Sequence, residues 1–254
     1  MESFNQKKNE RKKLLLPQIL ESMAKKHDET EDQLAQVEEA LTRTESFIEE
    51  NQKLLGIIMG AIIVVVGGYY AYNLLYRAPL EEEAAAEMFV AEMYFEQDSL
   101  RLALEGNTQF YGFLEIMDRY SSTDAGKLAK YYAGVAYFEM GDYAEAIRQL
   151  DEFSTEDPHL ATVTYGLIGD AFSELGQSEE ALEYYNKAVS RSKSEFLSPV
   201  YLMKAGTEAE KLAMFEEALD SYKTIQEDFP EAQEANGIEK YIEKIEKLQA
   251  FSSN

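Results

Sequence analysis

Apolar residues recur at three- and four-residue spacing through most of the chain after residue 84. The pattern begins with Met88, Ala91, Tyr94 and Phe95, and this spacing places side chains on one face of an α-helix. No downstream segment alternates apolar and polar residues as a half-buried β-strand would. The sequence therefore predicts an all-α fold for the C-terminal part of the chain.

An uncharged apolar segment lies nearer the N-terminus. Residues 54–76 read LLGIIMGAIIVVVGGYYAYNLLY. At about 1.5 Å per residue, such a helix spans about 34 Å, enough to cross a hydrocarbon core of about 30 Å. Tyr69, Tyr70, Tyr72 and Tyr76 suit the aromatic belt of a membrane interface. We predict a single transmembrane helix over 54–76, and the alternative is the buried helix of a soluble core. A cleavable signal peptide is disfavoured because 53 residues precede the segment.

One face of this predicted helix carries small residues. Gly56, Gly60, Gly67 and Ala71 fall within about 60° of one another at about 100° per residue. Small side chains let a second helix approach closely in a membrane, although glycine is also common in membrane helices generally. We predict a helix–helix interface at these four residues, with that general enrichment as the alternative.

A short connection follows the membrane segment. Pro79 is expected to break the helix, and the acidic triplet over residues 81–83 favours the first turn of the next one. Helical patterns then cover residues 84–104 and 109–119. We predict a linker and a degenerate helix pair over 77–126.

Three later stretches resemble one another. They read YYAGVAYFEMGDYAEAIRQL from Tyr131, GLIGDAFSELGQSEEALEYY from Gly166 and MKAGTEAEKLAMFEEALDSY from Met203. Each has a glycine in its first half (Gly134, Gly169, Gly206) and an alanine in its second (Ala146, Ala181, Ala218), with spacings of 35 and 37 residues. Small residues at both places let two antiparallel helices approach, as in a stacked helical repeat.

These residues resemble the tetratricopeptide repeat, whose period is about 34 residues. The matching residues are Tyr137, Gly141, Ala146 and Pro158 in the first repeat, Tyr165, Phe172, Gly176, Ala181, Tyr185 and Ala188 in the second, and Leu202, Phe215, Ala218, Tyr222 and Pro230 in the third. Lys130, Ala213 and Lys193 depart from the pattern, replacing a large aromatic residue, the turn glycine and the closing proline. The resemblance implies a helical solenoid with three repeats over 127–232.

The last segment shows a single amphipathic pattern. Its apolar stripe consists of Ile238, Tyr241, Ile242, Ile245 and Leu248. We predict a C-terminal helix over 233–254 that caps the solenoid and turns a polar face outward.

The repeat register implies which side chains line a concave groove. They are Tyr131, Val135, Phe138 and Glu139, then Val163, Asp170, Ser173 and Glu174, then Met203, Thr207, Glu210 and Lys211. Chaperone-binding members of the family hold a terminal carboxylate with Lys, Asn and Arg. Of the corresponding residues here, Tyr131, Val135, Leu167, Val200 and Lys204, only Lys204 is suitable. We therefore expect extended or unfolded protein segments with apolar and basic residues to bind. The alternative is that these side chains only keep the solenoid soluble.

Composition limits the remaining functions. The 254 residues include 48 acidic and 24 basic side chains, for a net charge of -24, which disfavours nucleic acid as a partner of the repeats. The chain has no cysteine and only two histidines, His27 and His159. It also lacks a phosphate-binding loop and a nucleophile elbow. We predict no catalytic residue, cofactor, metal ion or small-molecule substrate.

The tail over residues 1–53 differs in charge from the repeats. It holds nine Lys/Arg, whereas residues 77–254 hold 15 Lys/Arg against 36 Asp/Glu. Because short basic flanks stay in the cytoplasm, we expect the tail there and the repeats across the membrane. The segment KKNERKK over 7–13 suits anionic lipid or a cytoplasmic partner, or is a solvated end. Apolar residues every seven positions from Leu34 to Leu55 predict a partly helical tail.

The whole layout resembles the ancillary subunits of the bacterial SecYEG translocon known as the YfgM-like family, in the form typical of Bacteroidota. Matching stretches within residues 45–245 are FIEENQKLL, AEMYFEQDSLRLALEG, FYGFLEIMDRY, LAKYYAGVAYFEMGDY, GLIGDAFSELG and LSPVYLMKAG. The resemblance implies an inner-membrane protein whose periplasmic repeats work beside translocon subunits and periplasmic chaperones. In that role it would receive or protect emerging polypeptides.

Two alternatives to this function stay open at this point. A structural scaffold of an envelope machine, such as the division or gliding apparatus, would have stable folded partners and no affinity for unfolded chains. A reversed topology would make the repeats a cytoplasmic receptor, which a reporter fused after Asn254 would reveal.

Overall fold

The computed structural model of the chain describes residues 47–252. The chain divides into two compact units, Met1–Ala71 and Tyr72–Asn254. The predictions for the basic segment over 7–13, and for the helical tail before residue 47, lie outside the described residues.

The described part of the first unit is helical and exposes its apolar side chains. Ile57, Val64 and Val65 keep 69%, 73% and 70% of their surface accessible. The helical stretch Phe47–Glu96, of 50 residues, is long and apolar enough to cross a membrane, and none of its most apolar window is buried. The apolar side chains of this window are therefore exposed within the described residues, whereas those of a core helix in a soluble domain are mostly buried.

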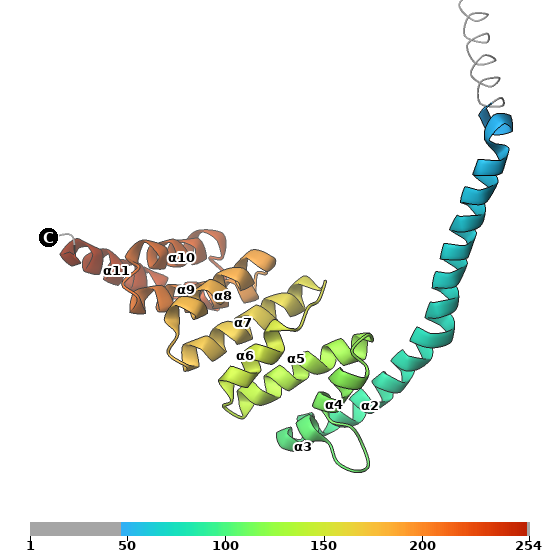
Figure 1. Cartoon of the computed structure of the whole chain (residues 1–254). Coiled ribbons are helices and arrows are strands. Elements are labelled where there is room, and N and C mark those ends of the chain that lie inside the picture. The colour runs from blue at the N-terminus through green and yellow to red at the C-terminus, as the bar shows by residue number, and fades with distance from the viewer. Residues whose placement is uncertain (1–46, 253–254) are drawn as a thin grey trace, which may run out of the picture. The chain divides into compact units, whose positions relative to one another are not determined.

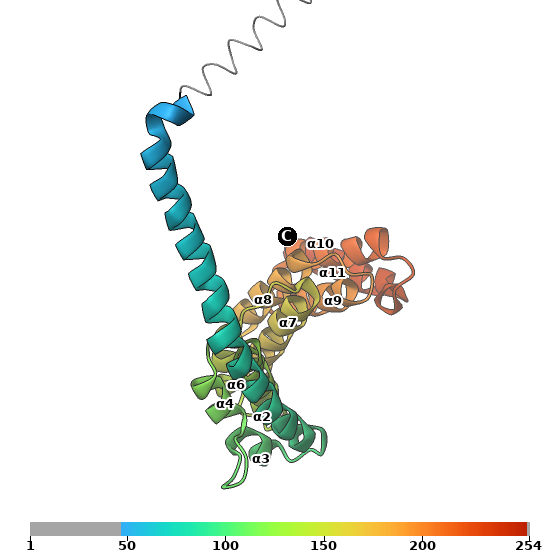
Figure 2. The same cartoon turned by 90° about the vertical axis from the view of Figure 1, so that its right-hand side faces the viewer.

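The second unit consists of helices that follow one another in space as they do in the chain (Figure 1). They are the π-helix η1 (Asn73–Arg77), α2 (Ala78–Glu96), α3 (Leu100–Glu105), α4 (Phe113–Arg119), α5 (Asp124–Glu139), α6 (Tyr143–Asp151), α7 (Pro158–Glu174), α8 (Ser178–Arg191), α9 (Leu197–Lys211), α10 (Phe215–Asp228), the 3-10 helix η2 (Gln233–Ala235) and α11 (Ile238–Ser252). From α4 onward each α-helix packs against the next, as the view in Figure 2 also shows. Residues 47–252 contain no β-strand, only an isolated bridge between Gly106 and Tyr111. The predicted all-α fold is confirmed for this part of the chain.

The prediction that Pro79 breaks the helix is wrong. Pro79 lies in the first turn of α2, which follows η1 directly. At this junction the amide of Ala78 donates to the carbonyl oxygen of Asn73, five residues earlier rather than four. The π-turn changes the pairing of backbone groups just before a residue that has no amide hydrogen, so the helix continues past it.

Glu81 of the acidic triplet lies in the first turn of α2, as the sequence predicted, and Glu81 and Glu83 also make tertiary contacts. The Glu81 carboxylate accepts hydrogen bonds from the amides of Asp124 at 2.8 Å and Ala125 at 2.9 Å, and so caps the N-terminus of α5. Glu83 accepts one from the hydroxyl of Tyr120 at 3.0 Å. Burial, together with this carboxylate, raises the pKa of Tyr120 to about 12. These contacts hold α2 against the start of the repeats.

Three helices, α2, α3 and α4, stand where a degenerate helix pair was predicted. The backbone turns at Asp98, whose φ is +59°, and α3 begins after this turn at Leu100. The side chain of Asn107 accepts hydrogen bonds from the amides of Gln109 at 2.7 Å and Phe110 at 3.3 Å, which shapes the loop before α4. The left-handed turn at Asp98 shortens the first helix of the predicted pair.

Each repeat is held together at its glycine. A Cβ at Gly169 would lie 2.7 Å from the ring of Tyr185. In the same way, Leu150 packs onto Gly134 in the first repeat and Tyr222 onto Gly206 in the third. The partner follows the glycine by 16 residues each time. The same glycine contact therefore joins the two helices of each repeat, α5 to α6, α7 to α8 and α9 to α10.

The turns inside the repeats also correspond. Gly141, Gly176 and Ala213 stand at the same place in their repeats, with φ of +80°, +72° and +56°. This left-handed region favours glycine. The third repeat therefore keeps the turn of the other two although an alanine occupies it.

The C-terminal helix α11 buries only part of its predicted stripe. Ile238, Ile242 and Ile245 are buried, whereas Tyr241 and Leu248 are 42% and 40% exposed. Tyr241 and Leu248 lie to one side of the isoleucine line, where the ring of Tyr241 contacts that of Tyr222, with centroids 5.4 Å apart. The predicted stripe is therefore only partly buried.

Candidate functional site

The first helix of each repeat carries all the predicted groove residues. Tyr131, Val135, Phe138 and Glu139 lie on α5, Val163, Asp170, Ser173 and Glu174 on α7, and Met203, Thr207, Glu210 and Lys211 on α9. On each helix these residues recur mainly at three- and four-residue intervals, so they share one face of that helix.

Seven of these residues surround one cavity of about 410 Å³, which we call the α7–α9 pocket. They are Phe138, Asp170, Ser173, Glu174, Met203, Thr207 and Lys211. Tyr185 of α8 and Lys204 and Glu208 of α9 complete its lining. None of these three was among the predicted groove residues: Tyr185 was named as a residue of the repeat pattern and Lys204 as suited to a terminal carboxylate. Glu208 was not singled out, although its spacing to Lys211 is that of an ion pair on one helix.

Asp170 is the centre of one polar group in the α7–α9 pocket. Both of its carboxylate oxygens accept from Nζ of Lys204, at 2.7 and 2.8 Å, and one also accepts from the hydroxyl of Tyr185 at 2.7 Å. Burial and this carboxylate raise the pKa of Tyr185. Lys204, the one residue suited to hold a terminal carboxylate, is therefore already paired inside the pocket.

Glu208 is the centre of a second polar group. Its side chain is only 4% exposed, and Oε1 accepts from Ser173 at 2.6 Å and from Lys211 at 2.8 Å. Oε2 is buried and has no hydrogen-bond partner within the described part of the chain. Burial acts to raise the pKa of Glu208, but Lys211 and the nearby hydroxyls of Ser173 and Ser178 outweigh it, so the pKa lies below its ordinary value. The carboxylate is thus ionised with one oxygen unused.

The other five predicted residues do not line the α7–α9 pocket. Glu210 accepts from the hydroxyl of Tyr222 at 2.8 Å and pairs with Lys244 of α11, so it is used in packing at the end of the stack. The ring of Tyr131 lies beside that of Phe153, with centroids 5.6 Å apart. Val135, Glu139 and Val163 occupy the same helix faces outside this cavity.

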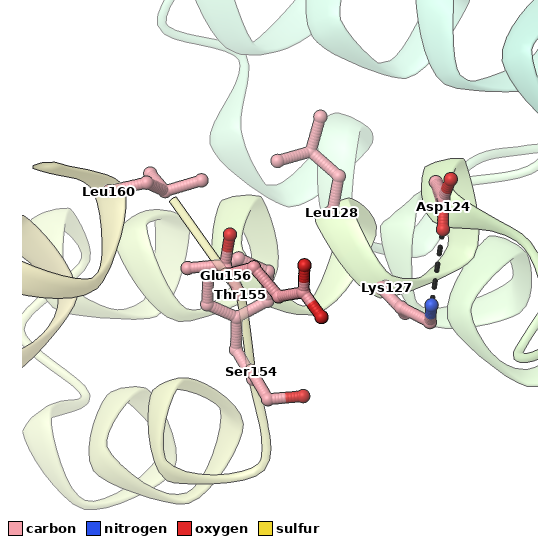
Figure 3. A pocket seen from close by; sticks show the side chains of 8 residues that line it. Asp124, Lys127, Leu128, Ser154, Thr155, Glu156 and Leu160 are labelled. Carbon is pink, nitrogen blue, oxygen red and sulfur yellow. Dashed lines mark hydrogen bonds and ion pairs between the residues drawn. The ribbon is translucent and has the colours of Figure 1, made fainter. Parts of the chain in front are cut away.

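A second cavity, of about 610 Å³, lies near the N-terminal ends of α5 and α7, and we call it the α5–α7 pocket. Asp124, Lys127, Leu128, Phe153, Ser154, Thr155, Glu156 and Leu160 line it. Figure 3 shows Leu128 reaching into this space from α5 and Leu160 from α7, with Lys127 paired to Asp124. This pocket is not apparent from the repeat pattern because half of its lining belongs to the loop between two repeats.

An apolar stripe along α5 links the two pockets. Leu128 lines the α5–α7 pocket and Phe138 lines the α7–α9 pocket. Tyr131 and Val135 fall between them at three- and four-residue spacing, on the same face. At about 1.5 Å per residue, the stripe is about 15 Å long.

Tyr201 of α9 lies across the middle of α7. A Cβ at Gly166 would overlap its ring, so only glycine leaves room for the ring there. The ring also stacks on Tyr185, with centroids 6.3 Å apart. Burial and the nearby Asp170 carboxylate raise the pKa of Tyr201 to about 12. Gly166 thereby shapes the face between the two pockets, a role the sequence did not indicate.

The four small residues of the apolar helix lie on an open face. Gly56, Gly60, Gly67 and Ala71 are exposed, and a Cβ at any of the three glycines would meet no atom within 4 Å. Their use as a helix–helix interface stays a prediction.

The two pockets are lined by carboxylates, ammonium groups, hydroxyls and apolar side chains. No group of three or more His, Asp or Glu residues able to hold a metal ion occurs within residues 47–252. Paired charges beside apolar surface suit non-covalent recognition.

Comparison with known proteins agrees with this arrangement. Two models of the tetratricopeptide repeat match residues 128–159, which contain most of α5 and all of α6, and residues 163–195, which contain most of α7 and all of α8. No curated protein matches the chain in sequence. The crystal structure of MamA protein is similar in fold, with a TM-score of 0.50 and 14% sequence identity over 65% of this chain and 87% of that chain. The chain therefore contains tetratricopeptide repeats, a unit that generally serves to bind protein partners.

Proposed function

We propose that the chain is a membrane-anchored interaction module whose repeats bind extended polypeptide along the faces of α5, α7 and α9. The observation that carries this proposal is the apolar stripe on α5 between the two pockets, from Leu128 to Phe138. An extended chain advances about 3.3 Å per residue, so about five residues of a partner cover the stripe. The pockets at its ends accept side chains from such a segment.

The lining of the pockets favours apolar and basic segments. Leu128, Phe153 and Leu160 supply apolar surface in one pocket, and Phe138 and Met203 supply it in the other. The repeats are strongly acidic, so their field attracts basic segments and repels acidic ones.

More specifically, we propose that the chain is an ancillary subunit of the Sec translocon, with its repeats in the periplasm beside periplasmic chaperones. The resemblance of the sequence to that family supports it, as does the exposed apolar helix within Phe47–Glu96. Polypeptides that emerge from a translocon are extended and unfolded, which is the form of ligand that the stripe accommodates. A scaffold that binds folded partners would not need an apolar stripe of this kind.

Binding to the groove is tested with a matched pair of variants of the full chain in nanodiscs. Thr207 lines the α7–α9 pocket and Ser190 lies on α8, and each hydroxyl donates to a backbone carbonyl at 2.9 Å. Thr207→Arg fills the pocket with a repelling charge, so we expect affinity for a reduced, unfolded polypeptide to fall about tenfold. Ser190→Arg should leave the affinity unchanged. Equal affinity of both variants and the parent, or no binding by the parent, would overturn the proposal.

The membrane role is tested separately. Photoreactive residues at Gly56 and Gly60 should capture translocon subunits in cells, and a periplasm-active reporter fused after Asn254 should be active. Capture of no translocon subunit contradicts the translocon role, and an inactive reporter contradicts the proposed topology.

A further inference from the structure

The C-terminal ends of α5 and α7 carry acidic residues where helices usually carry basic ones. Their last residues, Glu139 and Glu174, are exposed, and neither last turn contains Lys or Arg. The C-terminus of a helix already bears partial negative charge, which favours cations there. Neither carboxylate has an ion-pair or hydrogen-bond partner within residues 47–252. Both helix ends therefore concentrate negative charge that no group among the described residues neutralises.

The lysines of the α7–α9 pocket do not neutralise these two carboxylates. Lys204 is held by Asp170 at 2.7 Å, and Lys211 is held by Glu208 at 2.8 Å. Both pairs lie within the lining of the pocket, and Glu174 is the carboxylate left over. The pocket therefore has a surplus of negative charge.

Glu208 provides an independent indication of a missing donor. Its side chain is 4% exposed and lines the pocket, and its Oε2 has no hydrogen-bond partner within the described residues. A buried acceptor without a donor is unfavourable, and a donor that enters the pocket would relieve it.

We infer that the α7–α9 pocket is a subsite for one basic side chain of an extended polypeptide. Glu174 supplies the countercharge at the helix end, and Glu208 supplies the inner acceptor. Phe138 and Met203 pack against the aliphatic part of the side chain. The inference rests on the proposed function, because the basic side chain belongs to a polypeptide bound along the same helices.

The geometry favours arginine over lysine in this subsite. A guanidinium group has five donors in one plane, so it can serve two separated carboxylates at once. It also stacks on an aromatic face such as that of Phe138. An acidic side chain offers no donor to Glu174 or to Oε2 of Glu208, and a neutral one brings no countercharge to them.

The test uses three fluorescent peptides that are identical except for Arg, Gln or Glu at one central position among apolar residues. Their affinity for the full chain in nanodiscs of zwitterionic lipid is measured by fluorescence anisotropy. We expect the Arg peptide to bind about tenfold more tightly than the Gln peptide, since a charge-assisted hydrogen bond is lost in the latter. The Glu peptide should bind most weakly, and added salt should reduce the Arg preference.

Glu174→Gln removes the countercharge at an exposed position and should reduce the Arg preference to about threefold or less. Glu231→Gln, at another exposed glutamate outside the pocket, is the matched control and should keep the full preference. Equal binding of the Arg and Gln peptides by the parent chain, or an unchanged preference in Glu174→Gln, overturns the subsite but leaves binding in the groove intact. Failure of the parent to bind any of the three peptides overturns the proposed function as well.

Discussion

Replacing Ala213 by glycine should stabilise the repeats. Ala213 has a φ of +56°, in the turn where the first two repeats have Gly141 and Gly176 at +80° and +72°. Its side chain is exposed, so the substitution removes little buried surface. The effect of Ala213→Gly therefore comes almost entirely from the backbone conformation.

The magnitude follows from two opposing contributions. A residue with a Cβ costs about 1–2 kcal/mol in the left-handed region, and glycine removes this cost. Glycine also gives the unfolded chain more freedom, which costs about 0.4–1 kcal/mol in stability. The net gain is about 0.5–1 kcal/mol, which for a domain of this size raises the unfolding midpoint by about 1–4 °C.

The assay is thermal and urea unfolding of the full chain, followed by far-ultraviolet circular dichroism. Gly176→Ala is the mirror experiment, because a Cβ at Gly176 would meet no atom within 4 Å and only its φ opposes the change. It should lower stability by about 0.5–1 kcal/mol. A lower midpoint in Ala213→Gly, or no change in both variants, would refute the claim that the third repeat keeps a strained turn.

Three further predictions concern packing, capping and pH. Gly169→Val drives a side chain into the ring of Tyr185 and should cost about 2 kcal/mol or more in urea unfolding; a loss below about 0.5 kcal/mol would contradict the glycine contact. Glu81→Ala removes the carboxylate that caps α5 and should cost about 1 kcal/mol, whereas Glu82→Ala, at its exposed neighbour, should stay within about 0.5 kcal/mol of the parent. Because the pKa of Glu208 is lowered from 4.5 on folding, its ionised form stabilises the fold above pH 4.5, and this contribution disappears as the pH falls through the folded pKa. The stability deficit of Glu208→Gln should therefore shrink below pH 4.5, and a deficit independent of pH would show that its charge does not matter.

The helix pairs were predictable because the contact that defines them is local in sequence. Gly134 and Gly169 meet partners 16 residues further on, within the same repeat. The turn positions were equally visible, and the substitution at Ala213 could be identified before its φ was known. Such features depend on neighbours that the repeat pattern itself specifies.

The contacts that the sequence did not reveal join elements of different repeats or lie outside the pattern. Gly166 faces Tyr201 from the next repeat, and Glu208 is buried because Ser173 of another helix covers one of its oxygens. Glu81 does lie in the first turn of α2, but nothing in its local pattern indicates that its carboxylate also caps α5, more than forty residues away. Pro79 was misjudged because a π-turn can re-pair the backbone before proline, and side-chain pattern carries no sign of it.

The central claim, that extended polypeptide binds along the first helices of the repeats, is tested most directly by mapping where an unfolded polypeptide touches the full chain. Photoreactive residues are placed at Glu139 and Thr207 on the groove side, and at Glu183 and Ser190 on exposed positions of α8. We expect cross-links from the two groove positions and little from α8. Equal cross-linking from both sets, or cross-linking from α8 alone, would contradict the central claim.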